Sequence, residues 1–198
     1  GHAFAIRYFG WSPRVVLHSF GGLAIYDPNF APWQSGRRPR RTGATQVLIS
    51  LAGPGAGFAL AVAVVLLLYI TQHAIRFPFF TSIVTLGAGK ELVWYDPEQP
   101  PSAITNAVFD LLQVNIYWGI LNLMPIYPLD GGQVARELFV ANSRDGVRQS
   151  LLLSIVVAIL LAVVGLQFGQ TFLAIMFGYM AYMNYQQLSG PVGGVGRW

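Results

Sequence analysis

Long uncharged segments, interrupted by short charged ones, form the main pattern of this chain. Residues 46–72 and 149–188 contain no Asp, Glu, Lys or Arg, and about 20 apolar residues are enough to cross a bilayer. The second segment is long enough for two crossings with a turn near residues 165–170. Another apolar segment carries Asp110 among its polar residues. The pattern predicts four membrane-spanning helices, at residues 46–72, 104–124, 149–166 and 170–188.

Shorter segments precede or connect these helices. Residues 1–10 have the apolar run and the final glycine of a helix end, and residues 131–142 predict a short helix. Residues 11–26 are rich in β-branched and aromatic residues, which predicts a hairpin or paired strands. We therefore expect an all-α polytopic membrane protein. It would form a single multi-span domain over residues 1–198, with a small membrane-associated β-hairpin or sheet element.

Composition supports a membrane protein and limits the metal chemistry open to it. Only 10% of the residues are charged, against about 25% in an ordinary soluble domain. Cysteine is absent, which excludes a disulfide or a thiolate-metal site in this sequence. A metal would have to bind through Asp, Glu or one of the three histidines, His2, His18 and His73.

The arginines predict how the helices are oriented. Four lie in residues 37–45 and three in residues 136–148, whereas the expected loop at residues 73–103 has only Arg76 and Lys90 against three acids. With the expected number of crossings, every arginine-rich segment falls on the same side of the membrane. Because positively charged loops stay in the cytoplasm, that side is predicted to be cytoplasmic.

The stretch from Asn122 to Gly132, with the sequence NLMPIYPLDGG, carries the clearest chemistry. An apolar helix runs into two prolines, then Asp130, then two glycines. A carboxylate at the end of a membrane-spanning segment is costly without a partner, so its default interpretation is functional. A metal is a natural partner, and His2 is the candidate co-ligand. Both residues lie shortly before an arginine, and so near the cytoplasmic end of their segments.

Simpler interpretations exist for several of these residues. Asp130 also fits a helix N-cap, with Gln133 completing a capping box. Asn122 fits a hydrogen bond to a neighbouring helix as well as it fits a catalytic contact. For His18 we expect a structural role in the strand region, for His73 a place at the membrane interface, and for Asp110 a near-interface polar group.

Together these motifs resemble the site-2 protease family of intramembrane zinc metalloproteases. In that family one membrane helix carries H-E-x-x-H, and a later one carries an N-x-x-P-x-x-P-x-D-G-type motif. The stretch from Asn122 to Gly132 is similar to the second motif, although Tyr127 stands where many members have proline. Gly1-His2-Ala resembles the end of the first motif. Leu51-Ala-Gly-Pro54 resembles the small-residue opening of the intervening helix, and Gly21-Gly22-Leu-Ala resembles the strand region.

The resemblance implies a Zn²⁺ cofactor with His2 and Asp130 as two of its protein ligands, and Asn122 as a contact to the oxyanion or the substrate. The first histidine and the general-base glutamate of H-E-x-x-H are expected just before Gly1. The implied activity is cleavage of transmembrane or membrane-proximal segments of membrane proteins by a metal-activated water. The implied location is a multi-pass position in a bacterial plasma membrane, with the active site near the cytoplasmic side.

Two other functions stay open. A catalytically inactive relative would bind or chaperone membrane proteins, and a substituted upstream histidine or glutamate would identify it. A transporter is suggested by the polar residues Asp110, Gln113 and Asn115, and inverted repeats would favour it. The expected partners are a substrate helix and the lipid bilayer. No nucleic acid is expected, because the arginines at residues 37–41 border a membrane span. No oligomeric state follows from the sequence.

Overall fold

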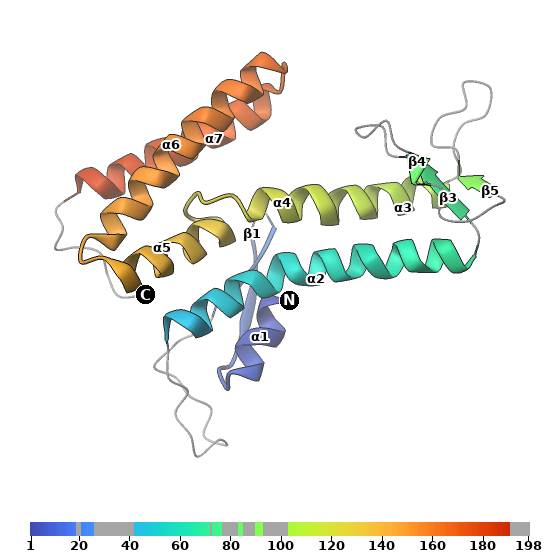
Figure 1. Ribbon diagram of the computed structural model, residues 1–198, viewed down its shortest axis with the longest axis horizontal. Coiled ribbons are helices and arrows are strands. Elements are labelled where there is room, and N and C mark those ends of the chain that lie inside the picture. Colours follow the sequence, from blue (N-terminus) through green and yellow to red (C-terminus); the bar gives the residue numbers. More distant parts are fainter. Residues whose placement is uncertain are drawn as a thin grey trace. The chain divides into compact units, whose positions relative to one another are not determined.

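The described part of the chain is mostly helical. The computed structural model describes residues 1–18, 21–25, 42–71, 73–76, 83–84, 90–92 and 103–190. Figure 1 shows the elements, which are α1 (His2–Tyr8), β1 (Arg14–His18), β2 (Gly21–Ile25), α2 (Gly43–Ile70), β3 (His73–Arg76), β4 (Ile83–Val84), β5 (Lys90–Leu92), α3 (Ala103–Gln113), the π-helical turn η1 (Val114–Trp118), α4 (Gly119–Asn122), α5 (Asp130–Asn142), α6 (Gly146–Gln167) and α7 (Thr171–Ser189).

The chain divides into two compact units, and α2 contributes to both of them. The first unit consists of the described parts of Gly1–Gly53 and Asn122–Trp198, and the second consists of those of Pro54–Leu121. All the residues that the sequence proposes as metal ligands or catalytic contacts belong to the first unit. That unit is therefore the one in which the candidate site can be described.

Apolar packing in the first unit attaches α1 to the beginning of α2. Ile6, Trp11 and Ile49 form a buried cluster, with exposed fractions of 0%, 2% and 4%. Gly10 has a φ of 90° just after α1, a conformation that glycine adopts without steric cost. The chain can therefore turn sharply there and place Trp11 against the same cluster. This packing holds the N-terminal helix beside the first turns of α2.

Two strands and a helical hairpin complete the first unit. β1 and β2 pair antiparallel, with Arg14 opposite Ile25 and His18 opposite Gly21, inside the segment for which paired strands are expected. α6 and α7 run side by side (Figure 1). Gly165 lies close to the start of α7, where an added Cβ would be 3.1 Å from the Ala174 nitrogen. The small residue therefore permits a tight turn between the two helices.

In the second unit α2 packs against the helix that runs from α3 through η1 to α4. Ala61, Leu68 and Leu112 are buried together, and the α2 residues lie about two turns apart on one face. Gly57 lets the helices approach closely, because an added Cβ would be 3.2 Å from Asn115 Oδ1. The Asn115 amide donates to the Leu111 carbonyl at 2.7 Å and sits within η1. Small residues of this kind on a helix face let a neighbouring helix backbone approach closely.

The segment at residues 73–103 differs from the expected loop. It contains the short strands β3, β4 and β5, in which β3 pairs antiparallel with β4 and parallel with β5. Ladder hydrogen bonds between these strands give their backbone polar groups partners that a loop would leave to water. The prediction of a loop throughout residues 73–103 is therefore wrong.

Two helices of the described residues, α2 and α6, are long and apolar enough to cross a membrane by length and composition. In the most apolar part of each helix, only 11% of α2 and 28% of α6 is buried. The core helix of a soluble protein would be mostly buried. Many large apolar side chains on both helices are exposed. The other two expected spans are also helical. However, η1 interrupts the first, and the second carries Asn184, Gln186 and Gln187 near its end.

Candidate metal centre

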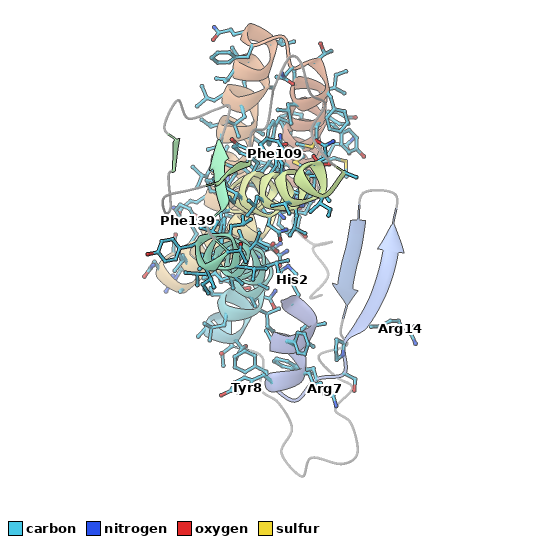
Figure 2. The ribbon with its side chains drawn as sticks, turned by 90° about the vertical axis from the view of Figure 1, so that its right-hand side faces the viewer. His2, Arg7, Tyr8, Arg14, Phe109 and Phe139 are labelled. Carbon is cyan, nitrogen blue, oxygen red and sulfur yellow. The ribbon has the colours of Figure 1, made fainter. Side chains whose placement is uncertain are left out.

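The candidate centre begins with His2, the first residue of α1. Figure 2 shows His2 at one end of this helix, and Arg7 and Tyr8 at the other. The apolar side of α1 contacts the first part of α2 through Ile6 and Ile49. This contact places the imidazole of His2 beside the α2 backbone.

A glycine of α2 makes room for the imidazole. An added Cβ at Gly53 would overlap the ring of His2, with only 2.7 Å to its Cδ2 atom. Gly1 shows the same close approach, since a Cβ there would lie 2.8 Å from the Gly53 Cα. In the sequence Gly53 is one of several small residues near the beginning of this helix. The structure shows that it accommodates a candidate ligand.

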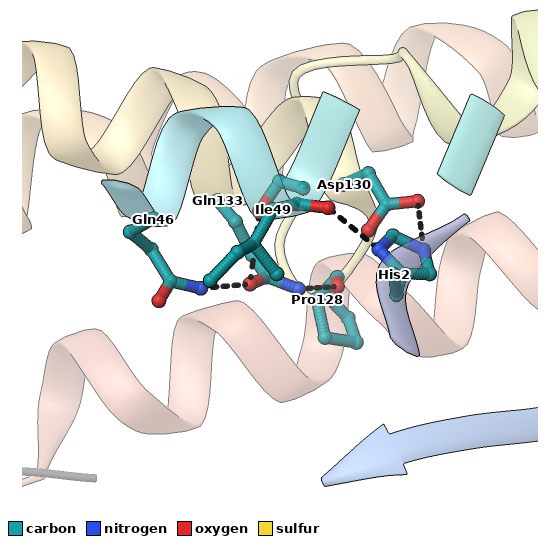
Figure 3. A network of polar contacts seen from close by, with 7 residues as sticks. His2, Gln46, Ile49, Pro128, Asp130 and Gln133 are labelled. Carbon is teal, nitrogen blue, oxygen red and sulfur yellow. Dashed lines mark hydrogen bonds and ion pairs between the residues drawn. The ribbon is translucent and has the colours of Figure 1, made fainter. Parts of the chain in front are cut away.

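Both ring nitrogens of His2 have polar partners in the first unit. Nδ1 lies 2.8 Å from the carbonyl oxygen of Ile49, and Nε2 lies 3.3 Å from Asp130 Oδ2 (Figure 3). A carbonyl oxygen only accepts hydrogen bonds, so Nδ1 must carry a proton and donate it. In the neutral imidazole this leaves a lone pair on Nε2, which faces the carboxylate of Asp130.

Two lone pairs that face one another need a proton or a cation between them. In the absence of a metal a proton serves. The hydrogen bond with Asp130 raises the pKa of His2 above its ordinary 6.5, against the opposing effect of burial. The His2 and Asp130 side chains are 32% and 14% exposed, so water screens their interaction only in part. A divalent cation would satisfy the same pair of atoms.

The spacing of the two atoms fits zinc. Zn–N and Zn–O bonds of about 2.0–2.2 Å in a tetrahedral arrangement put two ligand atoms about 3.3–3.5 Å apart. The observed Nε2–Oδ2 distance is 3.3 Å. A ligating histidine also typically donates its other N–H to a carbonyl or carboxylate, as Nδ1 does to Ile49. Among the described residues no group of three His, Cys, Asp or Glu side chains comes together, and the candidate ligands that they supply are the pair His2 and Asp130.

Asp130 is the first residue of α5, and the glycines that follow it determine how it is presented. A Cβ on Gly131 would overlap the backbone of Leu123, and one on Gly132 would overlap the backbone of Ile126. The first turn of α5 can therefore pack directly against the preceding loop. The helix N-terminus also favours a negative charge at this position.

The capping interpretation of Asp130 is wrong. The N-cap of α5 is Leu129, and no side chain caps this helix. The Gln133 side chain points to other partners: its oxygen accepts from Gln46 Nε2 at 3.2 Å and Ser50 Oγ at 3.4 Å, and its Nε2 donates to the Pro128 carbonyl at 3.3 Å (Figure 3). Gln133 thus connects the loop before Asp130 to α2, and the Asp130 carboxylate is left to face His2.

Comparison with known families agrees with this arrangement. The family model described as peptidase family M50 matches residues 1–163, most of the chain. The chain belongs to peptidase family M50. This is the site-2 protease family that the motifs resemble, and it is a family of membrane metalloproteases of the intramembrane type. The match spans both candidate ligands and the whole NLMPIYPLDGG stretch. A search of curated proteins finds no match to the chain.

The other residues singled out in the sequence have no described hydrogen bond to this pair, or their side chains are outside what is described. Asn122 ends α4, half-buried, and no hydrogen bond of the described residues joins it to His2 or Asp130. Asp110 lies exposed on α3 in the second unit. The backbones of His18 and His73 lie in β1 and β3, and their side chains are outside the described atoms.

Sequence reasoning missed the polar residues that hold the M50 motif in place. Ser154 on α6 and Asn184 on α7 both hydrogen-bond the backbone of Tyr127. Ser and Asn at such positions look like ordinary polar residues in apolar helices. Only their burial, 1% and 0% exposed, and their contacts distinguish them. The one available signal was the presence of an Asn within an apolar segment.

Proposed function

We propose that this chain is the membrane domain of a zinc-dependent intramembrane endopeptidase. The observation that carries the proposal is the pairing of His2 Nε2 with Asp130 Oδ2 at 3.3 Å, while Nδ1 donates to the Ile49 carbonyl. This arrangement directs two lone pairs to one point, which suits a metal with tetrahedral ligands. Membership of peptidase family M50 supports the protease assignment.

His2 and Asp130 would hold the zinc. When bound, zinc lowers the pKa of a coordinated water to about 7 and so supplies a nucleophile at neutral pH. The Ile49 carbonyl orients the His2 ring by accepting its Nδ1–H. The H-E-x-x-H motif of this family would supply a further histidine ligand and the general-base glutamate. Asn122, just before the proline-containing loop, is proposed to contact the substrate backbone or the developing oxyanion.

The proposed substrate is a transmembrane or membrane-proximal segment of another membrane protein. A helical segment must be locally extended before cleavage, since its carbonyls are otherwise hydrogen-bonded within the helix. The outer edge of the β1–β2 pair is proposed to bind the extended segment by strand addition. Consecutive N–H groups point to opposite sides of a strand, so only one of Val15→Pro and Val16→Pro removes an outward N–H. If neither variant slows cleavage while zinc stays bound, strand addition at β1 is refuted.

The proposed location is a multi-pass position in a bacterial plasma membrane, with the site near the cytoplasmic side. The apolar, largely exposed helices α2 and α6 support insertion in a bilayer. The arginines near both ligands, Arg7 and Arg136, support the orientation. Labelling of single cysteines introduced near these arginines in intact cells would test it, and labelling by an impermeant reagent from outside would contradict it.

The direct test of the function compares zinc content and cleavage of a transmembrane peptide between the full-length wild type and Asp130→Ala. We expect the variant to lose both. Asp145→Ala is the matched control, because Asp145 is an exposed aspartate at the N-cap position of α6 whose side chain makes no capping hydrogen bond. Retention of zinc and activity by Asp130→Ala would refute the proposal. Retention of zinc with no cleavage by the wild type would instead support a catalytically inactive relative.

A further inference from the structure

The backbone of Tyr127 is hydrogen-bonded on both sides by side chains of other helices. Its N–H donates to Ser154 Oγ at 3.0 Å, and its carbonyl accepts from Asn184 Nδ2 at 2.6 Å. Ser154 Oγ also lies 3.4 Å from the carbonyl oxygen of Pro125. α6 therefore holds this short loop through the N–H of Tyr127, and α7 holds it through the carbonyl of the same residue.

The chemistry of Asn184 shows that this contact is specific. Both partners of its amide, Tyr127 and Met180, present carbonyl oxygens, so the NH₂ group must face them. The residue is 0% exposed, and its Oδ1 has no hydrogen-bond partner among the described residues. A buried amide oxygen without a partner is unfavourable, and an apolar residue would avoid that cost. The amide therefore has a use at this position, and the Tyr127 carbonyl is the partner outside its own helix.

The loop held in this way leads directly to Asp130. Leu129 N–H donates to the Ile126 carbonyl at 2.8 Å, so the chain between Tyr127 and Asp130 is a tight turn. Arg136 lies over the Tyr127 ring, 5.5 Å from its centroid. A displacement of the Tyr127 backbone would therefore move the first residue of α5, which carries the candidate ligand.

We propose that Ser154 and Asn184 are positioning residues of the His2–Asp130 centre, which set the location of Asp130 by holding the Tyr127 backbone. This inference rests on the proposed function. Asn184 lies beyond residues 1–163, so the part of the chain that matches the family does not include it. The C-terminal helix α7 thereby contributes to the metal centre without supplying a ligand.

The test measures Zn²⁺ affinity by competition with a chelator, and the visible spectrum of the Co²⁺-substituted full-length protein. Ser154→Ala and Asn184→Ala are each expected to weaken Zn²⁺ binding about 10–100-fold, the usual effect of removing a group that orients a ligand. Both are also expected to change the Co²⁺ spectrum, which reports ligand geometry. Ser154→Thr keeps the hydroxyl and is expected to restore affinity toward the wild-type value.

Ser150→Ala is the matched control. Ser150 lies one turn before Ser154 on the same helix, is 3% exposed, and its hydroxyl donates within the helix to the Val147 carbonyl at 2.8 Å. The Ser150→Ala variant removes an equally buried hydroxyl that does not contact the loop at Tyr127. If Ser154→Ala and Ser150→Ala have the same Zn²⁺ affinity and the same Co²⁺ spectrum, the positioning role is overturned even if both variants unfold more easily.

The two proposals fail in different ways. Loss of metal in Asp130→Ala together with wild-type affinity in Ser154→Ala overturns the positioning role and leaves the function standing. Retention of metal and cleavage in Asp130→Ala overturns the function itself. If Asn184→Ala does not fold, the comparison of Ser154→Ala with Ser150→Ala decides the question.

Discussion

Replacement of Gly53 by alanine separates helix stability from metal binding. In an exposed helix this change favours the helix by about 1 kcal/mol, because glycine is the more flexible residue. At Gly53, however, the new methyl group would lie 2.7 Å from His2 Cδ2 and would overlap the rest of the ring. An ordinary carbon–carbon contact is about 3.5–4.0 Å. The imidazole must therefore move by roughly an ångström.

A shift of that size is large for a metal ligand. Metal–ligand distances hold to within about 0.2 Å, so a movement of about 1 Å would remove His2 from the coordination sphere or strain α1 against α2. It would also break the 2.8 Å bond from Nδ1 to the Ile49 carbonyl. A misplacement of about 1 Å can lower the rate of an enzyme by about 100-fold. We therefore expect Gly53→Ala to lower Zn²⁺ affinity at least 100-fold, and peptide cleavage to a similar extent.

Gly55→Ala provides the control on the same helix, since a Cβ there meets no described atom within 4 Å. It is expected to keep zinc and activity and to unfold at the same or a slightly higher temperature. Zinc retained after dialysis against a chelator, peptide cleavage and thermal unfolding would be measured for both variants. Wild-type zinc content and activity in Gly53→Ala would show that the close approach of α2 to His2 does not determine the site.

Further predictions concern the pair itself and the packing that supports it. Asp130→Asn removes the largest influence that raises the pKa of His2 and leaves burial to lower it. NMR titration of the metal-free variant should therefore give a lower pKa for His2 than in the wild type. An unchanged or higher pKa would contradict this assignment. Gly132→Ala places a Cβ into the backbone of Ile126 and should destabilise the protein by about 1–3 kcal/mol. The measurement is denaturant unfolding, with Gly178→Ala as the control, because a Cβ at Gly178 meets no described atom within 4 Å. Ile6 is 0% exposed, so Ile6→Ala should lower the free energy of unfolding by about 2–5 kcal/mol. It should also weaken zinc binding, because α1 carries His2. A variant as stable as the wild type would argue against this cluster as the support of His2.

The helices could be predicted from the sequence because their signal is local. The uncharged segments at 46–72 and 149–188 predict helices that the structure contains as α2, α6 and α7. The short helix expected at 131–142 is confirmed as α5. The π-helical turn η1 and the strands β3 to β5 were not predicted. η1 contains Asn115, whose side chain bonds the Leu111 carbonyl, and the strands depend on pairing between short segments.

The candidate site could be predicted only in part. A carboxylate at the end of an apolar helix is recognisable in one dimension, because burial of a charge is costly wherever the partner lies. The capping interpretation of Asp130 was equally available to the sequence, since both residue types and their spacing suit it. It fails because Gln133 has better partners in Gln46 and Ser50, which are remote in sequence.

By itself the sequence determined which residues of this protein can carry the chemistry. With no cysteine and three histidines, the choice of ligands was small, and the motif around Asp130 marked one of them. Only the tertiary structure decided how those residues are arranged. The ring orientation of His2 depends on the Ile49 carbonyl and the space at Gly53, and the place of Asp130 depends on the bonds from α6 and α7 to Tyr127. Such contacts join residues far apart along the chain, so their geometry exists only once the helices have packed.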